Sequence, residues 1–307
     1  GAGCCVVVKP ASEAAGSCMA VIQALHDAGM PAGTVNLVTG DSGFISEVLV
    51  GSPKIAKITL TGSTSVGRKM LHLAAEGIKR VSMELGGHAP VIVFDDADID
   101  SAVEGAMASK YRNAGQTCVC ANRIYVQAGV YDAFAEKLAL AVKKLSIGDG
   151  LVAGTTTGPL INQDAVEKVE EHIADVLAGG GKIVTGGKRH ALGGTFFEPT
   201  VVTGVTPDMM VANEETFGPL APLFKFDTEA EVIARANDTI FGLASYFYAR
   251  DIGRITRVQE QLEYGMVGVN TGLISNEMAP FGGVKQSGLG REGSHHGIDD
   301  YMELKYV

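Results

Sequence analysis

The sequence predicts an α/β fold in which strands and helices alternate. Short runs rich in β-branched residues, such as Cys4–Val8 and Lys57–Leu60, are typical of strands. Longer segments between them, such as Glu13–Ala28, have apolar residues at helical spacing. The alternation runs along the chain, whose 307 residues are enough for two domains. This rhythm indicates a mostly parallel, doubly wound sheet with right-handed connections.

The first helix of this pattern is well delimited, because Gly29 and Pro31 follow Glu13–Ala28 and end it. The other elements expected before residue 95 are strands at Val35–Val38, Lys57–Leu60, Val81–Leu85 and Pro90–Phe94, and helices at Ile45–Val50 and Ser65–Glu76.

The same rhythm continues after residue 95 with larger elements. The tail Tyr301–Val307 alternates as an exposed strand does, and such an edge is suited to pairing with another chain. The remaining expected elements are helices at Ile99–Lys110, Val130–Leu145, Gln163–Ala178 and Glu229–Asn237, and strands at Ile124–Gln127, Pro222–Phe226 and Met266–Val269.

Composition narrows the class of protein. The formal net charge is −10 and the sequence has no block of Lys and Arg, which disfavours a nucleic-acid partner. No apolar run is long enough to span a membrane, and the start lacks the features of a signal peptide. Five cysteines, an odd number, do not make a disulfide framework. We therefore expect a reducing compartment, namely the cytoplasm or an organelle matrix.

Two segments near the start have features of a phosphate or nucleotide site. In "LTGSTSVGRKM" a strand ends, Gly62 and Ser63 form a turn, and a helix opens whose N–H groups are suited to phosphate. The segment lacks the Gly-Lys-Ser/Thr of a P-loop, and a capped helix is the plainer alternative. Lys9 leaves the carboxyl end of a strand, where open α/β sheets bind ligands, or is a solvated surface lysine.

Two further segments carry candidate catalytic groups. Glu84, in "MELGG", lies among apolar residues, so burial could raise its pKa and suit it to general-base catalysis. The alternative is a capping or ion-paired carboxylate. In "NAGQTCVCAN" a turn at Gly115 and Gln116 precedes Cys118, whose thiolate would be a nucleophile beside backbone N–H groups able to hold an oxyanion. The alternative is a cysteine that fills a small gap in the core.

The other cysteines and the paired histidines are assigned structural roles. The strand and helix patterns place Cys4, Cys5 and Cys18 in the core as packing residues. No further ligands stand at the short spacing that a zinc site needs, so we expect no metal. His295 and His296 are adjacent and are interpreted as surface residues.

Six segments, in this order, resemble the aldehyde dehydrogenase superfamily along essentially the whole chain. The segments are "KPAS", "LTGSTSVG", "MELGG", "NAGQTC", "EETFGP" and "PFGGVKQSGLGREG". Within the superfamily, "YRNAGQTCVCANR" and "EETFGPLAP" most resemble succinate-semialdehyde dehydrogenases.

The resemblance implies a reaction and the residues for it. Cys118 matches the nucleophile that attacks the aldehyde to give a thiohemiacetal and then a thioester. Glu84 matches the base that activates water to hydrolyse the thioester, which argues against coenzyme-A acylation. Residues implied in cofactor binding are Lys9 at the adenine ribose, Gly62 and Ser63 at the pyrophosphate, Glu215 at the nicotinamide ribose and Phe217 beside it.

Cofactor and substrate preferences follow from single positions in this resemblance. NAD-preferring relatives often carry Glu where this chain has Ser12, and a carboxylate would repel a 2′-phosphate, so NADP is expected in preference to NAD. Arg112 matches an arginine that grips the succinate-semialdehyde carboxylate, and Ser275 a serine that helps it. Glutarate semialdehyde is the alternative substrate. Succinate semialdehyde would suggest 4-aminobutyrate degradation, by analogy.

Cys120 has two interpretations. Some dehydrogenases that this chain resembles use a cysteine pair as a reversible off-switch, so an oxidised Cys118–Cys120 pair would block catalysis. Two extended residues apart, the Cα atoms stand near the upper limit for a disulfide, about 7 Å, and the loop must bend. The alternative is that Cys120 is a small packing residue.

The resemblance also implies a domain organisation. Residues 1–86 match the C-terminal portion of a Rossmann-type cofactor domain, and residues 87–286 match an α/β catalytic domain. Residues 287–307 match a segment that returns to the cofactor domain and ends in an oligomerisation strand, as in homodimers or homotetramers. The chain starts on a core-like strand, so we expect the family's N-terminal part to be absent. A fragment that keeps the fold but has weak activity or none is therefore a further alternative.

Overall fold

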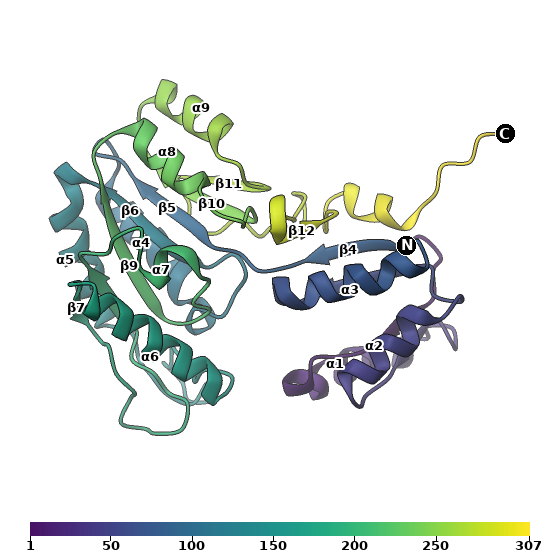
Figure 1. The fold of residues 1–307 in the computed structure, drawn as a ribbon. Coiled ribbons are helices and arrows are strands. Elements are labelled where there is room, and N and C mark those ends of the chain that lie inside the picture. The colour runs from purple at the N-terminus through teal and green to yellow at the C-terminus, as the bar shows by residue number, and fades with distance from the viewer. The chain divides into compact units, whose positions relative to one another are not determined.

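The computed structural model describes all residues 1–307 and divides them into two compact units. Unit 1 consists of Gly1–Glu84, Glu277–Pro280 and Leu289–Val307. Unit 2 consists of Leu85–Asn276 and Phe281–Gly288. Figure 1 labels the helices α1–α9 and many of the strands of the two units.

Unit 1 has two small sheets. Strand β1 (Val6–Val8) pairs in parallel with β2 (Val35–Leu37). Strand β3 (Lys57–Thr61) pairs in parallel with β4 (Arg80–Glu84), in a sheet of order β12–β4–β3. The other elements of the unit are η1 (Ser12–Ala14), α1 (Ala15–Asp27), α2 (Ser42–Gly51), α3 (Thr64–Glu76) and η5 (His296–Tyr301). Strand β12 (Gly288–Leu289) consists of the last residue of unit 2 and the first residue of this C-terminal part of unit 1.

Unit 2 is built on a seven-stranded sheet of order β11–β10–β5–β6–β9–β8–β7. All neighbouring strands run parallel except β7 and β8, which are antiparallel. The strands are β5 (Ala89–Val93), β6 (Ala121–Gln127), β7 (Lys182–Thr185), β8 (Thr200–Thr203), β9 (Leu220–Phe226), β10 (Ala244–Tyr248) and β11 (Met266–Val269).

Helices cover both faces of this sheet (Figure 1). Helices α4 (Ile99–Tyr111) and α5 (Tyr131–Val142) pack on one face, around buried residues such as Val91 and Phe134. Helices α6 (Gln163–Ala178), α8 (Glu229–Asn237) and α9 (Ile252–Gln261) pack on the other, around Ile92 and Phe224. The short helices are η2 (Arg112–Gly115), η3 (Ala128–Val130), α7 (Met210–Asn213) and η4 (Lys285–Ser287).

The observed elements confirm the alternating α/β pattern. The helices at 163–178 and 229–237 and the strand at 266–269 have the expected bounds. Strands β7, β8 and β10 and helices α7 and α9 were not expected from the sequence. Residues 302–307 are exposed and pair with no strand of this chain. Pairing of the tail with another chain stays a prediction.

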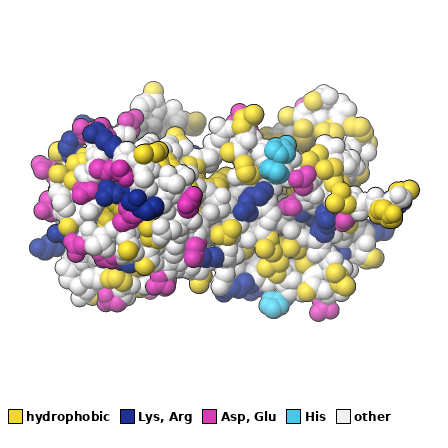
Figure 2. Space-filling model, turned by 90° about the horizontal axis from the view of Figure 1, so that it is seen from above, with side chains coloured by type: hydrophobic (Ala, Val, Ile, Leu, Met, Phe, Trp, Pro, Cys, Tyr) yellow, Lys and Arg dark blue, Asp and Glu magenta, His cyan; other side chains and the backbone are white.

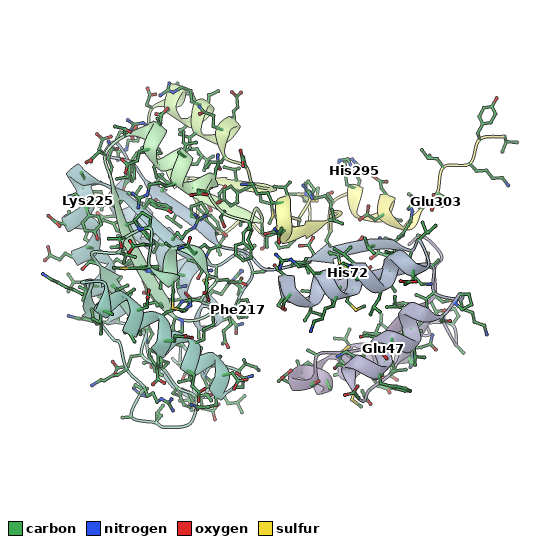
Figure 3. The ribbon with its side chains drawn as sticks, viewed as in Figure 1. Glu47, His72, Phe217, Lys225, His295 and Glu303 are labelled. Atoms are coloured by element: carbon green, nitrogen blue, oxygen red, sulfur yellow. The ribbon has the colours of Figure 1, made fainter.

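The expectation that the three N-terminal cysteines are buried is wrong in this structure. Cys4 and Cys5 are exposed and Cys18 is half-buried. The reason is that β1 has a single neighbouring strand and that α1 buries only Ile22. His295 and His296 are exposed, as expected, and their ring centroids lie 3.9 Å apart (Figure 3).

The surface shows no segregation of charge on the face drawn in Figure 2, where Lys and Arg side chains lie among Asp and Glu. None of the helices combines the length and the apolar character needed to cross a lipid bilayer.

Candidate active site

Three loops meet at the amino edge of the central strands of unit 2. Strands β5, β6 and β9 are parallel neighbours, with Ala89 opposite Ala121 and Ile124 opposite Leu223. Because parallel neighbours start at the same edge of a sheet, the segments that precede them come together. These segments contain "GG" before β5, "NAGQTCVC" before β6 and "EETFGP" before β9.

Cys118 lies in a tight reversal between α4 and β6. Asn113, Ala114 and Gly115 have φ values of 53°, 54° and 77°, so three successive residues are in the left-handed region. That region is tolerated by Asn and Gly but is unfavourable for Ala, so the conformation of Ala114 persists only where surrounding contacts hold it. The N–H of Cys120 then donates to the carbonyl of Thr117 at 3.0 Å, which closes a turn with Cys118 inside it.

Close backbone contacts hold this turn from two sides. A β-carbon on Gly87 would lie 2.1 Å from the carbonyl oxygen of Cys118, so only glycine fits there without movement. A β-carbon on Gly115 would lie 2.2 Å from the carbonyl oxygen of Gly218. The hydroxyl of Tyr246 donates to the carbonyl of Val119 at 2.8 Å. Cys118, which is half-buried, is thus presented on a fixed backbone.

Cys120 points into the protein beside a buried lysine. Its thiol is fully buried, and Lys110 Nζ donates to Cys120 Sγ at 3.3 Å and to Asn122 Oδ1 at 3.0 Å. Burial raises the pKa of Cys120, although the Lys110 ammonium opposes this effect. Burial likewise lowers the pKa of Lys110, which the neighbouring Cys120 and the charge of Glu215 oppose.

Glu215 and Phe217 lie on the loop between α7 and β9. Glu215 Oε1 accepts a hydrogen bond from the N–H of Gly87 at 3.0 Å. Burial raises the pKa of Glu215 to about 7, although the Gly87 N–H, Lys168 and Lys110 act in the opposite direction. Phe217 has a φ of 52° and is 40 % exposed (Figure 3).

The two predicted substrate residues are both exposed in unit 2. Arg112 ends α4, and its charge is near enough to oppose the raised pKa values of Cys120 and Tyr246. Ser275 lies in the loop after β11, next to Ile274, which packs against the core.

Glu84 is the last residue of β4 in unit 1, and its side chain is 5 % exposed. Its Oε2 has no hydrogen-bond partner. Burial raises the pKa of Glu84 to about 7, the negative charge of Glu292 adds to this, and Arg291 opposes it. A carboxyl group of this kind is half ionised near neutral pH, which is the property of a general base. The backbone N–H of Gly62 donates to the carbonyl of Glu84 at 3.0 Å.

The remaining predicted cofactor residues lie in loops of unit 1. Lys9 follows β1, and its Nζ donates to Ser42 Oγ at 2.8 Å, near the start of α2. Ser63 caps α3 by accepting from the N–H of Val66 at 3.4 Å. Ser12 is exposed at the start of η1. An ammonium group, serine hydroxyls and a helix N-terminus are the donors that suit phosphate and ribose groups, so these residues fit a nucleotide cofactor.

The structure therefore brings Cys118, Cys120 and Glu215 into one cluster of loops in unit 2, and pairs Gly62 with Glu84 in unit 1. No group of three or more His, Cys, Asp and Glu side chains is arranged to hold a metal ion.

Sequence reasoning missed two residues that support the turn containing Cys118, namely Gly87 and Lys110. A signal for Lys110 was available, because it follows Ala102 and Ala106 at four-residue steps and so lies on the buried face of its helix. Gly87 stands in the segment "MELGG", and nothing in the sequence shows its close contact with Cys118.

Comparison with known proteins shows the family to which the chain belongs. The model described as "Aldehyde dehydrogenase family" matches residues 1–307. Glutarate-semialdehyde dehydrogenase of Pseudomonas aeruginosa is 63 % identical over 100 % of this chain and 63 % of that protein. The NADP⁺ succinate-semialdehyde dehydrogenase of Escherichia coli K12 is 62 % identical over 100 % of this chain and 64 % of that protein.

A solved structure, that of succinate-semialdehyde dehydrogenase from Burkholderia pseudomallei, gives a TM-score of 0.98 at 62 % identity, covering 99 % of this chain and 63 % of that one. The fold class expected from the sequence is confirmed. This chain spans slightly less than two thirds of the length of these relatives. Because the family model matches from the first residue to the last, the chain belongs to the aldehyde dehydrogenase family.

Proposed function

We propose that the protein oxidises an acidic semialdehyde, in the first place succinate semialdehyde to succinate, with a nicotinamide cofactor. The observation that carries the proposal is the thiol of Cys118, half-buried on a turn whose backbone Gly87 and Tyr246 hold in place. The names of the relatives from Escherichia coli and Burkholderia pseudomallei support the substrate.

Cys118 forms the covalent bond in this reaction. Its thiolate attacks the carbonyl carbon of the aldehyde, and the carbonyl electron pair moves to the oxygen to give a thiohemiacetal. The backbone N–H of Cys118 donates to that oxyanion. Loss of hydride from the same carbon leaves a thioester on Cys118. A bound NADP or NAD would supply the hydride acceptor.

Glu84 provides the base for the second half of the reaction. Its carboxylate takes a proton from the water that attacks the thioester, which releases the acid and returns the thiolate. A pKa of about 7 lets the same group accept and release this proton near neutral pH.

The cofactor proposal assigns a residue to each part of the nucleotide. Lys9, Ser12, Gly62 and Ser63 would bind the adenosine and pyrophosphate parts. Glu215 would bind the nicotinamide ribose, and Phe217 would lie beside it. Ser12 presents no carboxylate against a 2′-phosphate, and a relative that is 62 % identical is named for NADP⁺. NADP is therefore proposed as the preferred cofactor, with NAD also accepted.

Glutarate semialdehyde is a second candidate substrate, because the relative from Pseudomonas aeruginosa that is 63 % identical bears that name. Both aldehydes carry a carboxylate at the far end, which Arg112 would bind with help from Ser275. The values of kcat/KM for the two aldehydes, measured with the same enzyme in competition, rank them as substrates.

Assembly and location are proposed from the remaining features. The exposed tail after η5 suits a homodimer or homotetramer built by strand pairing. All five cysteines are free, which supports a reducing compartment, either the cytoplasm or an organelle matrix.

Cys120 is proposed as the partner of Cys118 in a reversible disulfide. Because Cys118 is half-buried and Cys120 is fully buried, Cys118 would meet the oxidant first and Cys120 would then resolve it. Peroxide should inactivate both proteins. Dithiothreitol should restore the activity of the wild type but not that of Cys120→Ala. Equal recovery of the two proteins would leave Cys120 as a packing residue.

The mechanism is tested by Cys118→Ser with Cys18→Ser as the matched control. Cofactor reduction is followed with both semialdehydes and with NADP and NAD. We expect loss of at least about 10³-fold in kcat for Cys118→Ser and an unchanged rate for the control, because the weaker hydroxyl nucleophile cannot replace the thiolate. Undiminished turnover in Cys118→Ser would contradict the mechanism. Absence of turnover in the wild type would contradict the proposed function.

A further inference from the structure

His172 is a fully buried side chain of α6 that the proposed reaction does not use. Its Nδ1 shares a hydrogen bond of 3.0 Å with the hydroxyl of Thr216, which is also buried. Its Nε2 lies 3.6 Å from Glu214 Oε2. The ring thus touches the two residues on either side of Glu215.

The hydrogen bond of His172 with Thr216 is stronger than its contact with Glu214. Burial lowers the pKa of His172, and Lys168 adds to this effect, while Glu214 opposes it. A neutral ring gains little from the nearby Glu214 carboxylate, whereas its hydrogen bond with the buried Thr216 hydroxyl remains.

Helix α6 supports the same loop at a second point. A β-carbon on Gly218 would lie 2.5 Å from Val169 Cγ2, so the loop backbone rests directly on the helix one turn before His172. Phe217, between the two supported residues, has a φ of 52°, which is unfavourable for a bulky side chain. Such a conformation is kept only where its surroundings hold it.

The loop Glu214–Gly218 also contacts the turn that contains Cys118. Glu215 accepts from the N–H of Gly87, and the carbonyl of Gly218 packs against Gly115. A displacement of Thr216 therefore moves the carboxylate of Glu215 before it moves Cys118.

We infer that His172 is a positioning residue that holds Thr216 and so places Glu215 for binding of the cofactor ribose. The inference rests on the proposed function for the role of Glu215. His172 contacts neither substrate nor cofactor in this scheme and acts only through the loop Glu214–Gly218.

Four variants of the full-length protein test it: His172→Leu, Thr216→Val, their combination, and His172→Asn. We expect His172→Leu and Thr216→Val each to raise KM for NADP about fivefold, the effect of one hydrogen bond, with kcat and the aldehyde KM within about twofold. The double variant should be no worse than either single one, because both remove the same contact. His172→Asn, whose amide can reach Thr216, should restore most of the affinity.

Val176→Ala is the matched control, since Val176 is a buried residue of the same helix. It should lower the melting temperature without changing KM for NADP. An equal rise in KM for Val176→Ala, or additive effects in the double variant, would overturn the inference.

Hydrogen exchange separates this inference from the proposed function. In cofactor-free protein, the amides of Glu215–Gly218 should exchange faster in His172→Leu than in wild type, and not in Val176→Ala. Unchanged exchange overturns the positioning role whether or not the protein binds a cofactor. A wild type that binds neither NADP nor NAD removes the proposed function, and faster exchange in His172→Leu then still supports the hold on Thr216.

Discussion

The carbonyl oxygen of Cys118 packs against Gly87 so closely that a β-carbon there would come within 2.1 Å of it. The N–H of the same Gly87 donates to Glu215. One glycine therefore joins the proposed nucleophile to the proposed cofactor-binding carboxylate, through its backbone on one side and its missing side chain on the other.

Gly87→Ala should reduce kcat by about 100-fold, because the added methyl displaces the Cys118 backbone by a distance on the scale of 1 Å. Steady-state kinetics measure the effect, and circular dichroism checks the fold. Gly129→Ala is the control, since its β-carbon would meet nothing within 4 Å. Normal turnover in Gly87→Ala would show that the turn tolerates this displacement.

Lys110→Met should lower the free energy of unfolding by about 1–3 kcal/mol, because Asn122 and Cys120 lose a buried partner. Combining it with Asn122→Leu should recover part of the loss, since both polar groups are then gone. Denaturant unfolding measures both, and Lys144→Met, on the surface, should stay within about 0.5 kcal/mol of wild type. No loss in Lys110→Met would contradict the pairing.

The pH dependence should follow Glu84. Only its carboxylate accepts a proton, so thioester hydrolysis should rise through pH 7 and level off about one unit above. Glu84→Gln should keep a single burst of cofactor reduction and lose turnover, while Glu76→Gln, which is exposed, should behave as wild type. Stopped-flow absorbance distinguishes the two phases, and steady turnover in Glu84→Gln would assign the base elsewhere.

The stability of the protein should reflect the same group. The folded pKa of Glu84 is about 7 against a usual value of 4.5, so the folded state binds the proton more tightly in that window. Stability from Glu84 is therefore lost as pH rises from about 4.5 to 7. The melting temperature of Glu84→Gln relative to wild type should accordingly be higher at pH 8 than at pH 4.5, and a difference independent of pH would contradict the raised pKa.

Arg112→Gln should lower kcat/KM for succinate semialdehyde by about 10- to 100-fold, the range for a hydrogen bond to a charged group. The kcat/KM for butanal, which has no carboxylate, should fall little in Arg112→Gln. The kcat/KM of Arg112→Lys for succinate semialdehyde should be intermediate, because lysine keeps the charge without the bidentate geometry. Equal losses for both aldehydes would show that Arg112 acts on the turn rather than on the substrate.

Much of the fold follows from local pattern. Helix α6 combines an Asn162 cap with a regular apolar stripe, and its bounds could be predicted. Strand β10 was missed, because its five residues are all buried and do not alternate between apolar and polar. The exposure of Cys4 and Cys5 depends on what lies beside β1, which no local pattern records.

The candidate site divides in the same way. Cys118 and Glu84 stand in motifs, so their chemistry could be named from the sequence. The left-handed backbone of Ala114 could not be predicted, since alanine does not favour it and the contact of Gly115 with Gly218 supports it. The helical spacing of Lys110 after Ala102 and Ala106 indicates the buried face of α4, but its hydrogen bonds to Cys120 and Asn122 depend on how α4 packs beside β6.

The amino-edge arrangement has a consequence for how the protein can be studied. Gly87, Cys118 and Gly218 are distant in sequence, and they meet only after β5, β6 and β9 have paired in register. Contacts of such long sequence separation form late and slowly. The rate at which Cys118 is alkylated should therefore report the last stage of folding of unit 2. This measurement needs neither substrate nor cofactor.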